Sequence, residues 1–261
     1  MTSHEGSRTP VDVVIPCWGG YAGYLERCLL SVVGASRIIV VGDVDLEETC
    51  RRLGAELVSR DGARTPGEAR GIGLAIATSP YVVFLDVDDE YLEGGLQTLC
   101  GLLDGHPQSV AVTAQLAGTK PGHTWPPRRA AAIACSGYGG PLLLFRNCYA
   151  VVGACVMRRE AVTSSLFPPL FDEDWHAAVR LVRIGRVHYV ERDVVRYDVR
   201  VGSVSRQCRP SAEVAMSHNA LLHTALSSRP GRSLLWRLLE PMARAWRGRQ
   251  DRRQQALWAD G

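Results

Sequence analysis

Two acidic clusters are the residues of this sequence that are most able to do chemistry. The first is Asp86-Val87-Asp88-Asp89, which follows the apolar run Tyr81 to Leu85 directly. Carboxylates crowded at a strand end repel one another unless a cation joins them. Mg²⁺ or Mn²⁺ is typically bound by one or two carboxylates together with water and substrate phosphates. The cluster therefore indicates a divalent cation (Mn²⁺ or Mg²⁺), held by Asp88 and Asp86, and a diphosphate ligand.

The second acidic cluster is Asp172-Glu173-Asp174, which precedes a helical pattern. Apolar residues recur there at i, i+3, i+4 and i+7, namely Trp175, Ala178, Val179 and Val182. A carboxylate at such a helix start can face the same cleft as the first cluster. Asp174 is therefore a candidate general base that takes a proton from a substrate hydroxyl.

Both clusters also have a purely structural interpretation. Acidic residues after a strand can solvate a loop, and Asp89 could be the N-cap of a helix over residues 91–103. Acidic residues in the first turn of a helix complement its dipole, for about 0.3–1 kcal/mol each. The order of elements along the chain bears on the choice between these interpretations.

Short β-branched runs that alternate with helical patterns predict the elements that position both clusters. The predicted strands are residues 11–16, 37–41, 55–58 and 81–85, and the predicted helices between them are residues 21–33, 46–53 and 68–78. This alternation is typical of βαβ units with a parallel sheet covered by helices on both faces. Ligands bind beyond the carboxyl ends of such strands, where Cys17-Trp18, Asp43 and the first acidic cluster stand.

The second half of the chain has weaker patterns. Residues 110–116 predict a strand, and a Gly/Pro-rich stretch after it predicts a loop. An apolar segment follows at 149–157, two short strand-like runs lie at 187–190 and 194–199, and the pattern from residue 211 onward is helical. We divide the chain into a flexible N-terminus (1–10), a catalytic domain (11–210, with halves 11–105 and 106–210) and a C-terminal basic helical region (211–261).

Composition limits the function classes. The net charge of +3 is small, so nothing demands a nucleic-acid partner. The eight cysteines lack C-x-x-C spacing, and neither a signal peptide nor a run of about 20 apolar residues is present, which favours a cytoplasmic protein. Residues 229–253 hold eight arginines against one Glu and one Asp. This basic tail either packs on the catalytic domain or makes peripheral contact with the inner membrane surface.

The segments that carry these patterns resemble, in their order, the inverting family 2 glycosyltransferases of the GT-A fold. The resemblance covers roughly residues 11 to 206 and rests on six segments: VDVVIPCW, IIVVGD, GEARGIGLAIATSPYVVFLDVDD, GACVMRREAV, FDEDWHAAVRLVRIGRV and VRYDVRVGSVSR. It implies a mostly parallel Rossmann-like sheet and transfer of a sugar from a nucleotide-diphosphate donor, of UDP or dTDP type, onto a hydroxyl-bearing acceptor.

The resemblance also implies roles for individual residues. The donor-binding residues would be Pro16, Cys17, Trp18, Asp43, Arg70, Asp86 and Val87. The sugar and acceptor pocket would include Gly153, Ala154, Glu173 and Trp175, with Asp174 as the base. Arg200 stands where many relatives have a metal-binding His, and it is a candidate for a diphosphate contact instead.

Two other functions remain open from the sequence. A nucleotidyltransferase could share the sheet and the metal-binding Asp, but it normally carries a cationic Gly-rich loop after the first strand. Here that loop is Cys-Trp-Gly-Gly-Tyr, with no cation before Arg27. A non-catalytic nucleotide-sugar-binding protein of the same fold is the second alternative. The processive-synthase segment Q-x-x-R-W is absent, which favours transfer of a single sugar.

Overall fold

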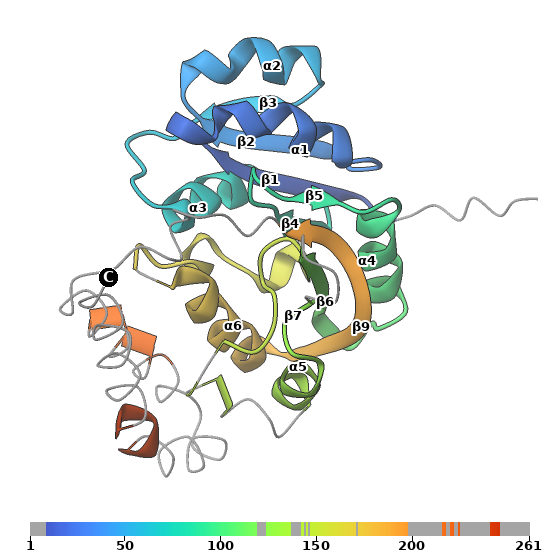
Figure 1. The fold of residues 1–261 in the computed structure, drawn as a ribbon, viewed down its shortest axis with the longest axis vertical. Helices are drawn as coiled ribbons and strands as arrows, with labels where there is room; N and C mark the ends of the chain where they lie inside the picture. Colours follow the sequence, from blue (N-terminus) through green and yellow to red (C-terminus); the bar gives the residue numbers. More distant parts are fainter. Residues whose placement is uncertain are drawn as a thin grey trace, which may run out of the picture.

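The run Val11–Cys17 forms strand β1, and all of its residues are buried. A strand with no exposed face belongs in the middle of a sheet that is covered on both sides. A computed structural model of the chain describes this sheet and its helices, over residues 9–118, 124–136, 142–143, 145, 147–170, 172–197, 216–217, 220–221, 224 and 241–245. Figure 1 shows the strands running through the middle of the molecule.

The described strands form one sheet in the order β3-β2-β1-β4-β8-β6-β9-β5, with β7 paired to β6. Their bounds are β1 (Val11–Cys17), β2 (Arg37–Gly42), β3 (Glu56–Ser59), β4 (Tyr81–Phe84), β5 (Glu90–Tyr91), β6 (Ser109–Gly118), β7 (Thr124–Trp125), β8 (Cys155–Arg158) and β9 (Arg186–Tyr197). The longer ladders are parallel: β3-β2-β1-β4 and β6-β9. The sheet is therefore mostly parallel, as predicted, with antiparallel joins at β8 and β5.

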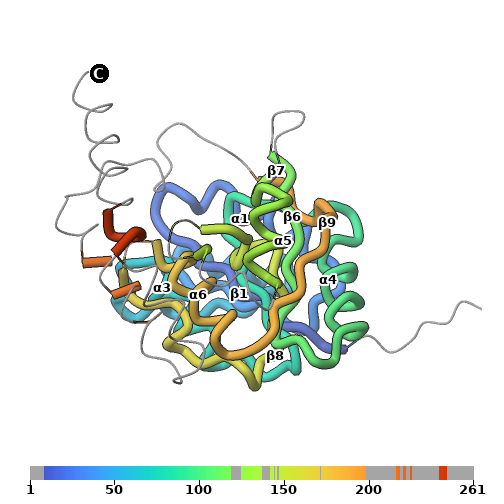
Figure 2. Tube along the Cα trace, turned by 90° about the horizontal axis from the view of Figure 1, so that it is seen from below, coloured from blue at the N-terminus to red at the C-terminus, as the bar shows by residue number. Residues whose placement is uncertain are grey.

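Helices cover both faces of the sheet. They are α1 (Leu25–Ser31), α2 (Glu47–Arg52), α3 (Pro66–Ile76), α4 (Gly95–Asp104), α5 (Arg128–Cys135) and α6 (Glu173–Ile184), with short 3-10 turns η1 (Gly19–Tyr24), η2 (Val44–Leu46), η4 (Arg159–Ala161) and η5 (Ser164–Leu166). One hydrophobic core lies under α3, α5 and α6, and a second lies under α1, α2 and α4. Figure 2 shows α3 and α6 on one side of the strands and α4 on the other.

Helix α3 begins where the sequence places a strong start signal. The side chain of Thr65 accepts a hydrogen bond from the backbone of Glu68, whose own side chain bonds back to Thr65, and Pro66 occupies the first turn. Gly73 lets the helix approach β1 closely, because an added Cβ would collide with Val14. A glycine at this position of the helix is thus explained by the neighbouring strand.

Several predicted elements differ from the structure in extent. The first predicted helix divides into η1 and α1, and the two runs predicted near residues 187–199 form the single strand β9. Residues 90–91 pair with β9 as a strand, so the next helix begins only at Gly95. Its N-cap is Gly94 in a left-handed conformation, and the alternative role of Asp89 as a helix cap is therefore wrong.

No disulfide joins the described cysteines to one another, and all but one of these cysteines are buried. No helix in the described ranges is long and apolar enough to span a membrane.

Candidate active site

The first acidic cluster lies in the turn after β4, and α1 holds its backbone. Arg27 donates to the carbonyl of Asp88 at 2.9 Å, and the backbone N–H of Asp89 donates to the carbonyl of Asp86 at 3.0 Å. Asp86 and Asp88 are partly exposed, whereas Asp89 is 3% exposed. The turn therefore presents Asp86 and Asp88 beyond the strand end and turns Asp89 inward.

Arg70 joins the two acidic clusters. It lies on α3, its side chain is 3% exposed, and its guanidinium contacts Asp86 at 2.5 Å and Glu173 at 2.8 Å. Burial lowers the pKa of Arg70, but the two carboxylates more than offset this effect, so its pKa lies above the ordinary value. The structure thus brings Asp86 of the first cluster and Glu173 of the second to one buried cation, although Arg70 and Glu173 are 103 positions apart in sequence.

Asp174 lies in the first turn of α6, next to Glu173. Its Oδ1 accepts the backbone N–H of Trp175 at 2.8 Å, and its Oδ2 accepts Nδ2 of Asn147 at 2.9 Å. Burial, with the neighbouring charge of Glu173, raises the pKa of Asp174 from 3.8 to about 6. A carboxylate with such a pKa is ionised at neutral pH and more basic than an ordinary Asp, which suits a general base.

The start of α6 is fixed by close packing and by an unusual backbone conformation. Asp172 is the N-cap, as the sequence predicted for the helix start, and its φ of 58° lies in the left-handed region. Gly67 of α3 leaves room for the side chain of Glu173, which a Cβ at this glycine would meet at 3.0 Å. Non-glycine residues in that backbone region are uncommon and cluster at functional sites.

The donor set fits a cation that is shared with a ligand. No group of three or more His, Cys, Asp or Glu side chains in the described ranges could hold a metal on its own. Asp86 is 40% exposed and one of its oxygens contacts Arg70. Mg²⁺ and Mn²⁺ in nucleotide sites need only one or two carboxylates, because phosphates and water complete the shell. Asp88 and Asp86 therefore fit a divalent cation that arrives with a diphosphate.

A separate polar group lies beyond β1, β2 and β3. Arg60 contacts the carboxylate of Asp43 at 2.5 Å, and its guanidinium lies 5.7 Å from the ring centre of Trp18. Because β2 and β4 flank β1, the end of β2, which Asp43 follows, stands two strands from the end of β4, about 10 Å at ordinary strand spacing. An aromatic ring beside paired hydrogen-bonding groups suits a nucleobase.

Other predicted site residues are buried. Cys17 is 1% exposed, and burial, together with Cys50, raises its pKa to about 12, so it cannot act as a thiolate. Pro16, Val87 and Ala154 are also buried, which leaves contacts through their backbones. Gly153 has a φ of 77° and donates its N–H to the carbonyl of Phe84 at 2.6 Å, beside the end of β4.

The remaining predicted residues are Trp175, Arg200 and those of the C-terminal region. Trp175 is half-buried and donates its indole N–H to the carbonyl of Leu143 at 2.7 Å. Arg200 lies outside the described residues, as does most of the basic tail. Among the described positions of the C-terminal region 211–261, Ser217 contacts His176 of α6 at 2.9 Å, with both side chains buried.

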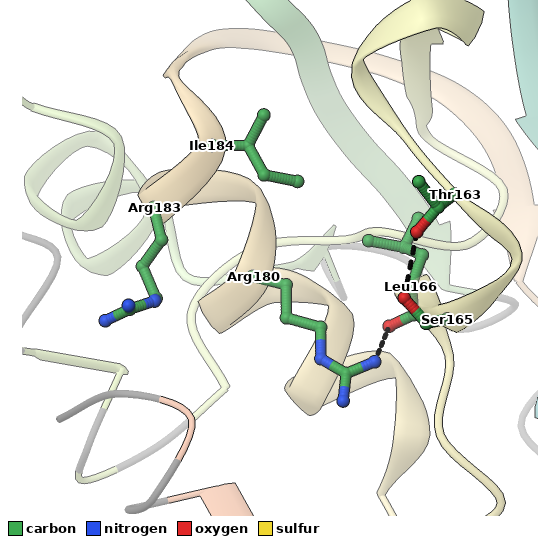
Figure 3. A pocket seen from close by; sticks show the side chains of 6 residues that line it. All are labelled: Thr163, Ser165, Leu166, Arg180, Arg183 and Ile184. Carbon is green, nitrogen blue, oxygen red and sulfur yellow. Dashed lines mark hydrogen bonds between the residues drawn. The ribbon is translucent and has the colours of Figure 1, made fainter. Parts of the chain in front are cut away.

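A hollow of about 290 Å³ lies at the far end of α6 and does not coincide with these clusters. Thr163, Ser165, Leu166, Arg180, Arg183 and Ile184 line it. Arg180 turns toward the carbonyl of Leu166, which it contacts at 3.2 Å, while Arg183 points in a different direction (Figure 3). The two guanidinium groups therefore do not converge on one position.

Sequence reasoning missed Arg60 and Asn147. Each is a single polar residue in a loop, without a periodic pattern or a spacing signature. Arg60 follows β3 directly, and the rule that ligands bind beyond the carboxyl ends of strands could have identified it. No comparable signal marks Asn147.

Comparison with solved structures identifies the fold as that of GT-A glycosyltransferases. Residues 1–349 of S. aureus TarS in complex with UDP-GlcNAc match with a TM-score of 0.68 and 15% identity, over 86% of this chain and 68% of that one. Mannosyl-3-phosphoglycerate synthase from Rubrobacter xylanophilus matches with a TM-score of 0.51 and 15% identity, over 84% and 73%. Glucosyl-3-phosphoglycerate synthase from Mycobacterium tuberculosis, bound to Mn²⁺, UDP and phosphoglyceric acid, matches with a TM-score of 0.50 and 20% identity. This match covers 84% of this chain and 78% of that one.

The sequence profile described as Glycosyl transferase family 2 matches residues 12–167. This is more than half of the chain, so the chain belongs to glycosyl transferase family 2. A search of curated proteins found no significant match.

Proposed function

We propose that this glycosyltransferase transfers a single sugar from a UDP- or dTDP-linked donor to an acceptor hydroxyl, with inversion at the anomeric carbon and with a divalent cation. The observation that carries the proposal is the buried guanidinium of Arg70, which contacts Asp86 and Glu173 together. Through these contacts Asp86, a proposed metal ligand, and the first turn of α6, which carries Asp174, both lie beside the guanidinium of Arg70.

Asp174 is the proposed general base. Its position at the start of α6 leaves it partly exposed, and its pKa of about 6 keeps it ionised at neutral pH while it remains basic enough to accept a proton. The acceptor O–H bond breaks and its proton goes to Asp174. The acceptor oxygen forms a bond to the anomeric carbon as the bond to the diphosphate breaks on the opposite face. One displacement of this kind inverts the anomeric centre.

Asp88 and Asp86 are the proposed metal ligands, and Mn²⁺ or Mg²⁺ would supply positive charge against the leaving diphosphate. Trp18, Asp43 and Arg60 would contact the nucleobase. Pro16, Cys17 and Val87 would contribute through their backbones. Gly153 and Ala154, with Glu173 and Trp175, would border the sugar and the acceptor, and Arg200 would contact the diphosphate.

The division of the chain is also a proposal. We assign catalysis to residues 11–210, whose two halves share one sheet in the described ranges. The region 211–261 would then pack on the catalytic domain through contacts such as that of Ser217 with His176, or would touch a membrane surface through its arginines.

The test is a screen of nucleotide sugars with wild type and Asp174→Asn, each with Mn²⁺, with Mg²⁺ and with EDTA. Release of nucleotide from one donor that depends on metal and is lost in the variant is the expected result. A proton NMR spectrum of the product, which reports its anomeric configuration, tests inversion. If no donor releases nucleotide and no metal-dependent nucleotide binding is found, the proposal is contradicted.

A further inference from the structure

Asn147 lies in a segment that hydrogen bonds hold against α6. On one side, Trp175 donates its indole N–H to the carbonyl of Leu143 at 2.7 Å. On the other side, the hydroxyl of Tyr149 donates to the carbonyl of Ala178 at 2.5 Å. Asn147 stands between these two anchors, so its amide is held beside the first turn of the helix.

The two ends of the Asn147 amide have different surroundings. Nδ2 donates to Oδ2 of Asp174 at 2.9 Å, whereas Oδ1 is buried and has no hydrogen-bond partner among the residues that the structure describes. An ionised carboxylate can only accept hydrogen bonds, so the amide nitrogen has to face it. The amide therefore gains a bond at Asp174 and leaves its own oxygen unsatisfied.

An unsatisfied buried carbonyl oxygen is unfavourable, and nearly all buried polar groups in proteins are paired. A leucine of similar size would fill the same space without this cost. Within the described part of the chain the amide bonds to Asp174, so we place the reason for an amide at position 147 at that carboxylate.

We propose that Asn147 is a positioning residue for Asp174, which fixes the orientation of the carboxylate and stabilises its ionised form. This inference rests on the proposed function of Asp174 as the base. Trp175 donates its backbone N–H to Oδ1 and Asn147 donates to Oδ2, so that each carboxylate oxygen has one donor. Two donors on opposite oxygens prevent rotation of the carboxylate, and each favours the charged form.

The other groups around Asp174 make this donor important. Burial is the largest influence on its pKa and raises it, and the charges of Glu173 and Asp86 raise it as well. Arg70 and the backbone N–H of Trp175 act in the opposite direction. Asn147 adds a neutral donor on the Oδ2 side, where it stabilises the ionised base without adding charge to the site.

The experiment compares Asn147→Leu and Asn147→Asp with wild type in the full chain. The carboxyl carbon signal of Asp174, identified by its absence in Asp174→Asn, is titrated by NMR. Loss of a hydrogen bond to a charged group should raise the pKa of Asp174 by about one to two units in the leucine variant. The aspartate variant should raise it further, because it adds a second negative charge.

Activity gives an independent result. In Asn147→Leu, the pH at which kcat/KM falls on the acid side should rise by as much as the pKa of Asp174 measured by NMR. Most of the activity should therefore return at pH 9. Tyr149→Phe is the matched control, since it removes a buried hydrogen bond of the same segment without touching Asp174. It should lower stability and leave both the titration and the acid limb unchanged.

An unchanged pKa of Asp174 in a folded Asn147→Leu variant would overturn the inference. Full turnover by Asp174→Asn would instead contradict the proposed base, whatever the result for Asn147. The two failures are therefore distinguishable, because the titration requires neither donor nor acceptor.

Discussion

Replacement of Arg70 by methionine would leave the carboxylates of Asp86 and Glu173 without the buried cation that joins them. The methionine keeps most of the volume and can still pack on Phe167, whose ring centre lies 5.1 Å from the guanidinium. The change therefore tests charge more than shape.

The expected loss in the free energy of unfolding follows from the burial of these side chains. Removal of one partner from a buried ion pair costs about 3–5 kcal/mol. Glu173 is 18% exposed and Asp86 is 40% exposed, so water can rehydrate Asp86 in part, and we take the lower value of about 3 kcal/mol. For a chain of this size, about 2–4 °C per kcal/mol gives a fall in Tm of about 6–12 °C.

The assay is thermal and urea unfolding of Arg70→Met at pH 7.5. Arg52→Met is the matched control, because Arg52 pairs with Glu26 at 3.0 Å with both side chains about half exposed, and loss of such a solvent-screened pair should change Tm far less than loss of Arg70. The double variant Arg70→Met/Glu173→Gln should recover part of the loss, since it removes one uncompensated charge. A loss below about 1 kcal/mol in Arg70→Met would refute the reasoning.

Two further predictions follow from the site. Because the pKa of Asp174 is raised to about 6, the folded state binds its proton more tightly than the unfolded state, and the contribution of this group to stability is lost as pH rises from about 4 through 6. Asp174→Asn should therefore raise the free energy of unfolding at pH 7.5 by up to about 3 kcal/mol and change it little at pH 4, which pH-dependent urea unfolding would reveal. Arg60→Met should weaken UDP binding about tenfold in isothermal titration calorimetry, through loss of a donor beside Asp43 and Trp18; unchanged affinity would exclude Arg60 from the nucleobase site.

Much of the fold could be predicted from local patterns. The apolar runs around Val11–Cys17 and Tyr81–Phe84 are strands because their residues are buried on both faces, and such runs are visible in a sequence. The start of α6 at Asp172 was equally predictable, since its apolar period begins there. The strand ends then located the first acidic cluster.

Contacts between distant segments could not be predicted in the same way. The pairing of Arg70 with Glu173 joins positions 103 residues apart, and no local period encodes it. The pairing of Glu90–Tyr91 with β9 likewise displaced the start of α4, because a distant strand completed hydrogen bonds that a helix would otherwise have made. Asn147 depends on the packing of its segment against α6, which only the tertiary structure shows.

The most direct test of the central claim is a comparison of turnover and donor binding in wild type and Asp174→Asn, with the donor that the screen identifies. We expect the variant to lose transfer by at least about a hundredfold, as for loss of a general base, while it binds the donor with Mn²⁺ as tightly as wild type does. A variant that binds the donor and still transfers the sugar at the wild-type rate would contradict the account.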